Sequence, residues 1–318
     1  MRAAITGATG FIGRHLAEHL LERHYHVRVL EHQRPIDLPV EKVHGSLLDD
    51  GVLDDLLSGV DVLFHLGAAL GGRALSAREF RRVNRDGSER IALAAIARRV
   101  ARMVHFSSAG VYGRSSGLTP LAENGPLNPV DSYEMSKLAG EQAVLALAER
   151  LDVSVIRPGW VYGEGDRRTF KLIKQINSGP FFIVGSGRVK HSPIHIADLL
   201  ELTEKIAVSG RRGEVYNGGG VNLTVNDMVQ TIAVILKKKP PRLRVPAALI
   251  VPAAWLLDQL ALSTGRELVL SSAKLAFFRR GKPLDMTKVE KEFGFVSRFD
   301  FAAGMSRAVN WYRDQGWL

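Results

Sequence analysis

The sequence contains no cysteine. Disulfide bonds, thiolate metal sites and cysteine nucleophiles are therefore excluded. It also lacks an apolar run long enough to cross a membrane. A strand is predicted to begin by residue 3, which leaves no room for a signal peptide before it. We therefore expect a soluble, cytoplasmic protein.

Metal-ligand spacings are missing as well. His191 and His195 stand four apart, but Pro193 between them disfavours a regular helix that would align their side chains. We therefore predict no metal site and interpret both as pocket or structural groups. The net charge is +10, yet no zinc-finger spacing or aromatic–basic RNA motif accompanies it. Solvated basic helix faces explain this charge, and we predict no nucleic-acid partner.

What is present is an ordinary globular composition, with 46% hydrophobic and 24% charged residues among 318. Strand and helix patterns alternate through the first half, which predicts an α/β fold with a doubly wound parallel sheet. We expect strands near residues 3–5, 26–30, 40–44, 60–66, 102–106 and 153–156, and a long helix over 76–99. After Pro158 the pattern becomes irregular. We assign 1–160 to the sheet domain and 161–318 mainly to a smaller substrate-binding lobe, with a strand near 213–217 returning to the sheet.

A glycine-rich turn, TGATGFIG at residues 6–13, joins the first strand to a helix with Ile12, Leu16 and Leu20 on one face. Backbone N–H groups at such a helix start attract a pyrophosphate, and glycines let the ligand approach closely. This arrangement is typical of a Rossmann-like dinucleotide site. The alternative is a turn that only packs a helix onto a sheet.

Glu31 stands eighteen residues after Gly13, at the end of the second predicted strand. A carboxylate there can accept hydrogen bonds from the adenosine ribose and repel a 2′-phosphate, which favours NAD over NADP. However, His32 and Arg34 follow, and Arg34 could pair with a phosphate. The alternative for Glu31 is a solvated glutamate at a strand end.

Two further segments carry catalytic residue types. YEMSK at 133–137 opens a helix capped by Asp131, and its spacing places Tyr133 and Lys137 on one face. A nearby ammonium would favour the phenolate, so that Tyr133 could take a hydroxyl proton. SSAGVYG at 107–113 follows the fifth strand, where Ser108 could orient the reacting oxygen. The alternatives are a chance spacing and a serine that caps its own turn.

These segments resemble the extended short-chain dehydrogenase/reductase superfamily, specifically the NAD-dependent epimerase/dehydratase group. The likeness covers nearly the whole chain. It runs through TGATGFIG (6–13), FHLGAA (64–69), VNRDG (83–87), HFSSAGVYG (105–113), YEMSK (133–137), RPGWVYGEGD (157–166), IHIADL (194–199), LDMTKVEKEFGF (284–295) and AVNWYRDQGW (308–317).

The resemblance implies a catalytic triad of Ser108, Tyr133 and Lys137, with Lys137 also bound to the nicotinamide ribose. It implies support of the active site by Asn84, and a homodimer. Together with the residues above, the expected NAD contacts are Gly7, Thr9, Gly10, Phe11, Ile12, Gly13, Glu31, Ser46, Leu47, Leu66, Ala68, Asn84, Tyr133, Lys137, Pro158 and Val161.

The chain departs from the group at three places. Ser46 stands where members often carry an aspartate that contacts adenine, and Trp160 replaces an asparagine that holds a substrate diphosphate. Lys190-His191-Ser192 replaces an Arg-Asp-Phe segment. The last two changes weaken the expectation of a nucleotide-sugar substrate. The tail and the turn at 185–188 are closer to members resembling 3β-hydroxysteroid dehydrogenases and dihydroflavonol reductases, so a lipid-like or sterol-like alcohol is the other expected substrate.

We expect reversible hydride transfer between NAD and a secondary alcohol or ketone. An epimerase that keeps NAD bound is the alternative. A dehydratase is disfavoured because Ala109, and no Asp-Glu pair, follows Ser108. A non-catalytic NAD-binding scaffold or sensor is a third reading, against which the retained Tyr133 and Lys137 count.

A basic segment at 237–244 precedes an apolar stretch at 245–257, within a helix expected over 246–262. This pattern could dock on an anionic membrane or line a lipid-sized pocket. We favour a helix buried in the core or at a subunit contact.

Overall fold

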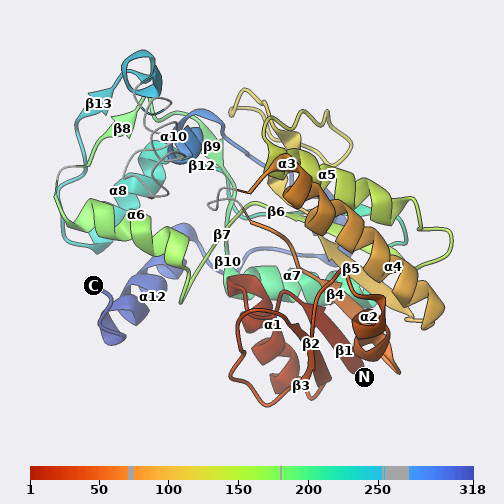
Figure 1. Ribbon diagram of the computed structural model, residues 1–318. Helices are drawn as coiled ribbons and strands as arrows, with labels where there is room; N and C mark the ends of the chain where they lie inside the picture. The colour runs from red at the N-terminus through yellow and green to blue at the C-terminus, as the bar shows by residue number, and fades with distance from the viewer. Residues whose placement is uncertain (71–74, 180, 253, 255–271) are drawn as a thin grey trace.

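The computed structural model describes residues 1–70, 75–179, 181–252, 254 and 272–318. Its centre is a seven-stranded parallel sheet in the order β11-β6-β5-β4-β1-β2-β3 (Figure 1). The strands are β1 (Arg2–Thr6), β2 (His26–Glu31), β3 (Glu41–His44), β4 (Val62–His65), β5 (Arg102–Phe106), β6 (Val153–Pro158) and β11 (Val215–Gly218). The predicted α/β class and its Rossmann-like sheet are confirmed.

The strand order reverses beside β1, which places the binding edge. The chain moves from β1 outward through β2 to β3, then crosses back to β4 on the other side of β1. Thr6 pairs with Leu30 on one side and with His65 on the other, so the loops after all three strands begin together. Ligands of such sheets bind at this switch point, outside the carboxyl ends of the strands.

Helices cover both faces of the sheet because successive strand residues point to opposite sides. Ala3 and Ile5 of β1 pack with α1 (Phe11–Glu22) and α7 (Ile196–Ser209), whereas Ala4 packs with α2 (Asp50–Leu57), α4 (Gly87–Ala97) and α5 (Ser132–Leu145). These two apolar layers fix the sheet between its helices.

The long helix expected over 76–99 is interrupted. It consists of α3 (Ala77–Arg81), a π-helical turn η1 (Arg82–Asp86) and α4. In this turn the side-chain amide of Asn84 binds the backbone of Ala69. Its Nδ2 donates to the Ala69 carbonyl at 3.1 Å, and its Oδ1 accepts from the Ala69 N–H at 2.7 Å. The π turn thus holds the loop after β4 in place. Apolar periodicity alone could not predict this interruption of the helix.

The remaining elements build a lobe to one side of the sheet (Figure 1). Its core joins α6 (Arg167–Asn177), α8 (Val225–Ile235) and α12 (Phe301–Asp314) through residues such as Ile173, Met228 and Met305. The lobe also contains three short strand pairs, β7 (Trp160–Tyr162) with β10 (Pro193–His195), β8 (Ile183–Val184) with β13 (Arg244–Val245), and β9 (Lys190–His191) with β12 (Leu223–Thr224), and the helix α10 (Ser272–Arg279). The next helix, α11 (Thr287–Phe293), returns to the sheet and packs against β11.

Two buried charged groups fasten separate elements together. Arg157 of β6 and Glu141 of α5 form a bidentate ion pair, with Nε–Oε2 at 3.0 Å. The Asp198 carboxylate of α7 accepts hydrogen bonds from the Ser297 hydroxyl at 2.6 Å and the Phe299 N–H at 3.1 Å. Asp198 therefore holds the segment before α12 in addition to lying in the first turn of its own helix.

The basic and apolar stretch is only partly described. Lys237, Lys238 and Lys239 are exposed, and residues 247–252 are helical. Ala254 is buried with Val184 and Leu275, as a core helix would be. The rest of the helix expected over 246–262 lies outside the described residues. Of the helices that are described, none has the length and apolar character required to span a membrane.

Candidate dinucleotide and catalytic site

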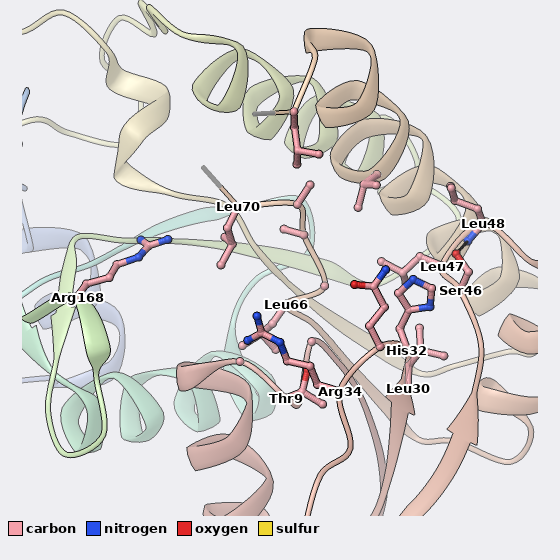
Figure 2. A pocket seen from close by; sticks show the side chains of 18 residues that line it. Thr9, Leu30, His32, Arg34, Ser46, Leu47, Leu48, Leu66, Leu70 and Arg168 are labelled. Atoms are coloured by element: carbon pink, nitrogen blue, oxygen red, sulfur yellow. Dashed lines mark hydrogen bonds between the residues drawn. The ribbon is translucent and has the colours of Figure 1, made fainter. Parts of the chain in front are cut away.

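A cavity of about 620 Å³ opens at the switch point of the sheet (Figure 2). Its wall combines the glycine turn, the loops after β2, β3 and β4, and one side chain of the lobe. The lining residues are Gly7, Thr9, Gly10, Leu30, His32, Gln33, Arg34, Ser46, Leu47, Leu48, Leu66, Gly67, Ala68, Ala69, Leu70, Leu75, Val83 and Arg168.

The glycine turn is shaped for close approach. Gly7 has a φ of +74°, and a Cβ there would lie 2.8 Å from the Leu66 carbonyl carbon. A Cβ on Gly13 would lie 2.2 Å from the Gly7 carbonyl oxygen. Gly10 begins α1 without a side-chain cap, which leaves the helix N-terminus to an anionic ligand. The turn and the cavity beside it therefore fit a dinucleotide pyrophosphate.

Seven of the predicted cofactor residues line this cavity: Gly7, Thr9, Gly10, Ser46, Leu47, Leu66 and Ala68. The others lie outside its lining: Phe11, Ile12, Gly13, Glu31, Asn84, Tyr133, Lys137, Pro158 and Val161. Their roles toward a cofactor stay predictions.

The Glu31 side chain is buried and its oxygens have partners within the chain. One accepts from the Ile36 N–H at 2.8 Å, and the other lies 3.0 Å from His44 Nδ1. Glu31 is thus neither solvated nor on the cavity wall, whereas His32 and Arg34 are on it. Strand alternation could have indicated this difference, since neighbouring residues of a strand face opposite sides.

Ser108 and Tyr133 are brought together. The Ser108 hydroxyl is close enough to the Tyr133 phenol to counteract the rise of its pKa, although 25 positions separate the two residues in the chain. The Ser108 oxygen also accepts from the Gly110 N–H at 3.0 Å and caps a short 3₁₀ helix, η2 (Ala109–Tyr112). The serine therefore performs the turn-capping role and stands beside the tyrosine as well. Asp131 caps α5 as predicted, by accepting from the Glu134 N–H at 2.8 Å.

Lys137 is buried and belongs to α5, the helix that also carries Tyr133. Its ammonium donates to the Phe106 carbonyl at 2.6 Å, and burial lowers its pKa to about 8, while the Glu141 carboxylate opposes that shift. Burial likewise raises the pKa of Tyr133. The cation that counteracts this rise is Arg168, helped by the Ser108 hydrogen bond. We expected Lys137 to be the ammonium that favours the phenolate, so Arg168 is a residue that the sequence motif did not indicate.

A buried chain of hydrogen bonds connects the cofactor edge to the π turn. Ser88 Oγ donates to the Asn84 carbonyl at 2.7 Å, so its oxygen must accept from His65 Nε2 at 3.0 Å. His65 Nδ1 then accepts from Thr6 Oγ1 at 2.7 Å. The bonding pattern assigns one neutral tautomer, and burial together with Lys137 lowers the His65 pKa to about 3.

The chain continues from Asn84 to the catalytic helix. Asn84 Nδ2 donates to Ser136 Oγ at 2.9 Å, and Ser136 donates to the Tyr133 carbonyl at 2.7 Å. Asn84 thus supports α5 at the residue that carries the phenol. Its position in the long helical segment was predicted, whereas the links through His65, Ser88 and Ser136 had no sequence motif to reveal them.

Of the departures from the family pattern, Ser46 lines the cavity, whereas Trp160 and His191 pack in the lobe. Trp160 packs against Phe277 and Phe301, with ring centroids 5.3 Å and 5.9 Å apart. His191 stacks on Phe277 at 4.5 Å and its Nε2 lies 2.8 Å from the Phe277 carbonyl. His195 caps α7 through the Ala197 N–H. Both histidines therefore have structural partners, and the described residues contain no cluster of three groups placed to hold a metal ion.

The family is decided by a comparison with family models. The model of the NAD-dependent epimerase/dehydratase family matches residues 3–219. The chain belongs to this family. Its relatives include the ceramide reductase of Caulobacter vibrioides, 31% identical over 99% of this chain and 95% of the relative. Another is N-acetyl-alpha-D-glucosaminyl-diphospho-ditrans,octacis-undecaprenol 4-epimerase of Escherichia coli O157:H7, 28% identical over 96% of this chain and 94% of the relative.

Solved structures of family members have the same overall fold. The crystal structure of gox2253 superposes with a TM-score of 0.83 at 27% identity, covering 99% of this chain and 98% of the other. MoeE5 in complex with UDP-glucose and NAD superposes with a TM-score of 0.78 at 26% identity, covering 99% of each chain. Like its relatives, this epimerase/dehydratase family member is an enzyme, and its family is NAD-dependent.

Proposed function

We propose that this family member is an NAD-dependent oxidoreductase that transfers hydride reversibly at a secondary alcohol or ketone. The observation that carries the proposal is the approach of the Ser108 hydroxyl to the Tyr133 phenol, which stands on the helix that the buried Lys137 anchors to the Phe106 carbonyl at the end of β5. All three follow or face the carboxyl ends of β5 and β6, next to the strand whose loop lines the cavity. Hydroxyl groups placed at this edge can act on a substrate oxygen there.

Each residue has a separate role in the proposed reaction. During oxidation, Tyr133 accepts the proton of the substrate hydroxyl, and during reduction it returns that proton to the new alkoxide oxygen. Ser108 donates a hydrogen bond to the substrate oxygen and so fixes its position relative to the phenol. Lys137 holds the helix that carries the phenol to the Phe106 carbonyl.

The residues of the cavity fit NAD, which supplies the hydride-accepting nicotinamide when bound. Gly7, Thr9 and Gly10 would hold the pyrophosphate, and Ser46 and Leu47 would flank the adenine. MoeE5 and other family members are known as complexes with NAD. For this chain, cofactor contacts by Glu31, Pro158 and Val161 are part of the proposal.

An epimerase is the second candidate, and the likeness to an undecaprenol-diphosphate sugar 4-epimerase over 94% of that relative favours it. The same Ser108 and Tyr133 would serve both reactions, because an epimerase removes and returns hydride at one carbon. Lipid-linked and lipid-like compounds recur in the names of the relatives, which also include a sterol demethylase protein. We therefore propose a lipid-like alcohol or a sugar diphosphate derivative as the substrate class.

The test is to incubate the purified protein with NAD and a panel of nucleotide sugars, ceramide-like alcohols and sterol-like alcohols. Absorbance at 340 nm and product analysis by mass spectrometry are followed together. Accumulating NADH with a ketone product identifies a dehydrogenase, and an inverted alcohol with no net NADH identifies an epimerase. NAD binding without turnover of any alcohol or ketone would favour the non-catalytic scaffold. The proposed homodimer and cytoplasmic location are checked by light scattering and by fractionation of cells.

A further inference from the structure

Among the described residues of the lobe, Arg168 alone lines the dinucleotide cavity. It stands in the first turn of α6, and Figure 2 shows its guanidinium directed toward the side of the cavity on which Leu70 lies. The side chain is exposed, and its charge acts on the Tyr133 phenol. Arg168 therefore stands where the cavity meets the proposed reacting groups.

The charge of Arg168 has no counter-ion in the described part of the chain. No carboxylate there forms an ion pair with its guanidinium, and no carboxylate is among the residues that line the cavity. The Asp166 carboxylate is directed to the backbone instead, where it accepts from the N–H groups of Arg168 and Thr169, both at 3.0 Å. Among the residues that the structure describes, no carboxylate therefore competes with an external anion for this guanidinium.

Of the arginines that the structure describes, Arg34 and Arg168 line the cavity, and their positions differ. Arg34 follows β2, whose last pairings with β1 put it beside the glycine turn that fits the cofactor pyrophosphate. Arg168 comes from the opposite unit and lies close enough to Tyr133 to oppose the rise of the phenol's pKa. The two cations thus suit two different anions, one on the cofactor and one on the substrate.

We propose that Arg168 binds an anionic group of the substrate, a phosphate, diphosphate or carboxylate, close to the carbon that exchanges hydride. This inference rests on the proposed function and narrows its substrate class to anionic alcohols and ketones. The planar guanidinium forms two parallel hydrogen bonds to such oxygens, which gives the site both affinity and orientation. A neutral sterol would leave the cation without a partner.

The neighbouring Arg167 offers a matched control. It has the same charge and lies one position away in α6, but its guanidinium lies over the Trp317 ring, 5.7 Å from the ring centre. Arg167 does not line the cavity. Replacing either arginine by glutamine removes one positive charge from the same helix turn, so a difference between the variants reports on position rather than on net charge.

The experiment is calorimetric titration of inorganic pyrophosphate into the protein saturated with NAD. We expect the wild type to bind pyrophosphate, Arg168→Gln to bind it about tenfold more weakly or worse, and Arg167→Gln to stay within about twofold. Arg168→Lys keeps the charge without the fork and is expected to lie between them. Thermal unfolding of each variant verifies that the fold is intact.

Two results would overturn the proposal. One is equal pyrophosphate affinity in Arg168→Gln and the wild type. The other is binding that NAD abolishes, since the anion would then occupy only the glycine turn. Tyr133→Phe should bind pyrophosphate normally, because binding requires no turnover. A protein that binds pyrophosphate through Arg168 but turns over no substrate would contradict the proposed function and not this site.

Discussion

At the scale of single residues, the site contains a buried positive charge that lowers the stability of the fold. Lys137 is buried, its ammonium has the Phe106 carbonyl as hydrogen-bond partner, and its pKa falls to about 8. The rings of His65 and His105 lie next to each other, with centroids 5.2 Å apart. Burial is the main cause that lowers the pKa of both histidines, and the charge of Lys137 lowers it further. A position that stabilised the fold alone would be apolar, so the lysine indicates a functional requirement.

Lys137→Met is therefore expected to stabilise the cofactor-free protein. The folded-state pKa of about 8 is lower than the ordinary 10.5, so folding carries a protonation penalty that is complete below pH 8. Removing it should raise the free energy of unfolding by ~2–3 kcal/mol at pH 7. The gain should shrink as the pH rises from 8 toward 10.5.

Urea unfolding of both proteins at pH 7 and pH 10 measures this difference. Lys205→Met, at a half-buried lysine of α7, is the control. A lower free energy of unfolding for Lys137→Met at pH 7 would contradict this prediction and show that the ammonium stabilises the fold.

Cofactor preference is a second property set by single residues. Although Glu31 is tied to Ile36 and His44, its negative charge remains at the end of β2 and should repel a 2′-phosphate. We expect NAD to raise the melting temperature more than NADP at equal concentration. At a hundredfold excess over Kd the stabilisation is about 2.7 kcal/mol.

Glu31→Gln should narrow the difference between the two cofactors, and thermal shift titration of both proteins measures it. His44→Gln removes the partner of the carboxylate while keeping the charge, and should leave the preference in place. A larger shift with NADP in the wild type would contradict the role of Glu31 and point to phosphate binding by Arg34 instead.

At the scale of elements, α5 and the π turn η1 depend on each other. Gly140 of α5 faces the Asn84 carbonyl so closely that a Cβ would lie 2.1 Å from its oxygen. Asn84 in turn bonds the Ala69 backbone and Ser136. The glycine therefore lets the catalytic helix approach the turn that positions the cofactor-edge loop.

Gly140→Ala should destabilise the protein by roughly 1–3 kcal/mol, because backbone must move to admit the methyl group. It should also lower turnover by displacing α5. Gly87→Ala is the control, since Gly87 has helical dihedral angles and a Cβ there would have ordinary contact with Leu47 at 3.5 Å.

At a helical position with room for a methyl group, as at Gly87, alanine is expected to be neutral or to stabilise the protein by about 0.5–1 kcal/mol relative to glycine. Chemical unfolding and steady-state rates measure both variants. Equal stability of Gly140→Ala and the wild type would show that the close approach is not required.

At the scale of the whole molecule, the sheet and the glycine turn could be predicted because they depend on local patterns. Apolar runs identify β1, β2, β4, β5 and β6, whereas β3 is polar (EKVH), and the glycine spacing identifies the turn after β1. The π turn at Asn84 could not be predicted, because it arises from contacts with Ala69 and Gly140, which lie far away in the sequence. Arg168 could not be predicted as a site residue for the same reason. It belongs to the lobe, and only folding brings it to the cavity and close to Tyr133. Glu31 shows the converse, a residue at the expected position whose side chain has other partners.

The most direct test of the central claim follows the hydride itself. The protein is loaded with NADH deuterated at the transferred position and mixed with the ketone of whichever substrate the panel identifies, and the product is examined by mass spectrometry. We predict one deuterium at the new carbinol carbon. Tyr133→Phe should form this product about 10²–10⁴-fold more slowly at saturating NADH. An unlabelled product, or an equal rate in Tyr133→Phe, would contradict the account.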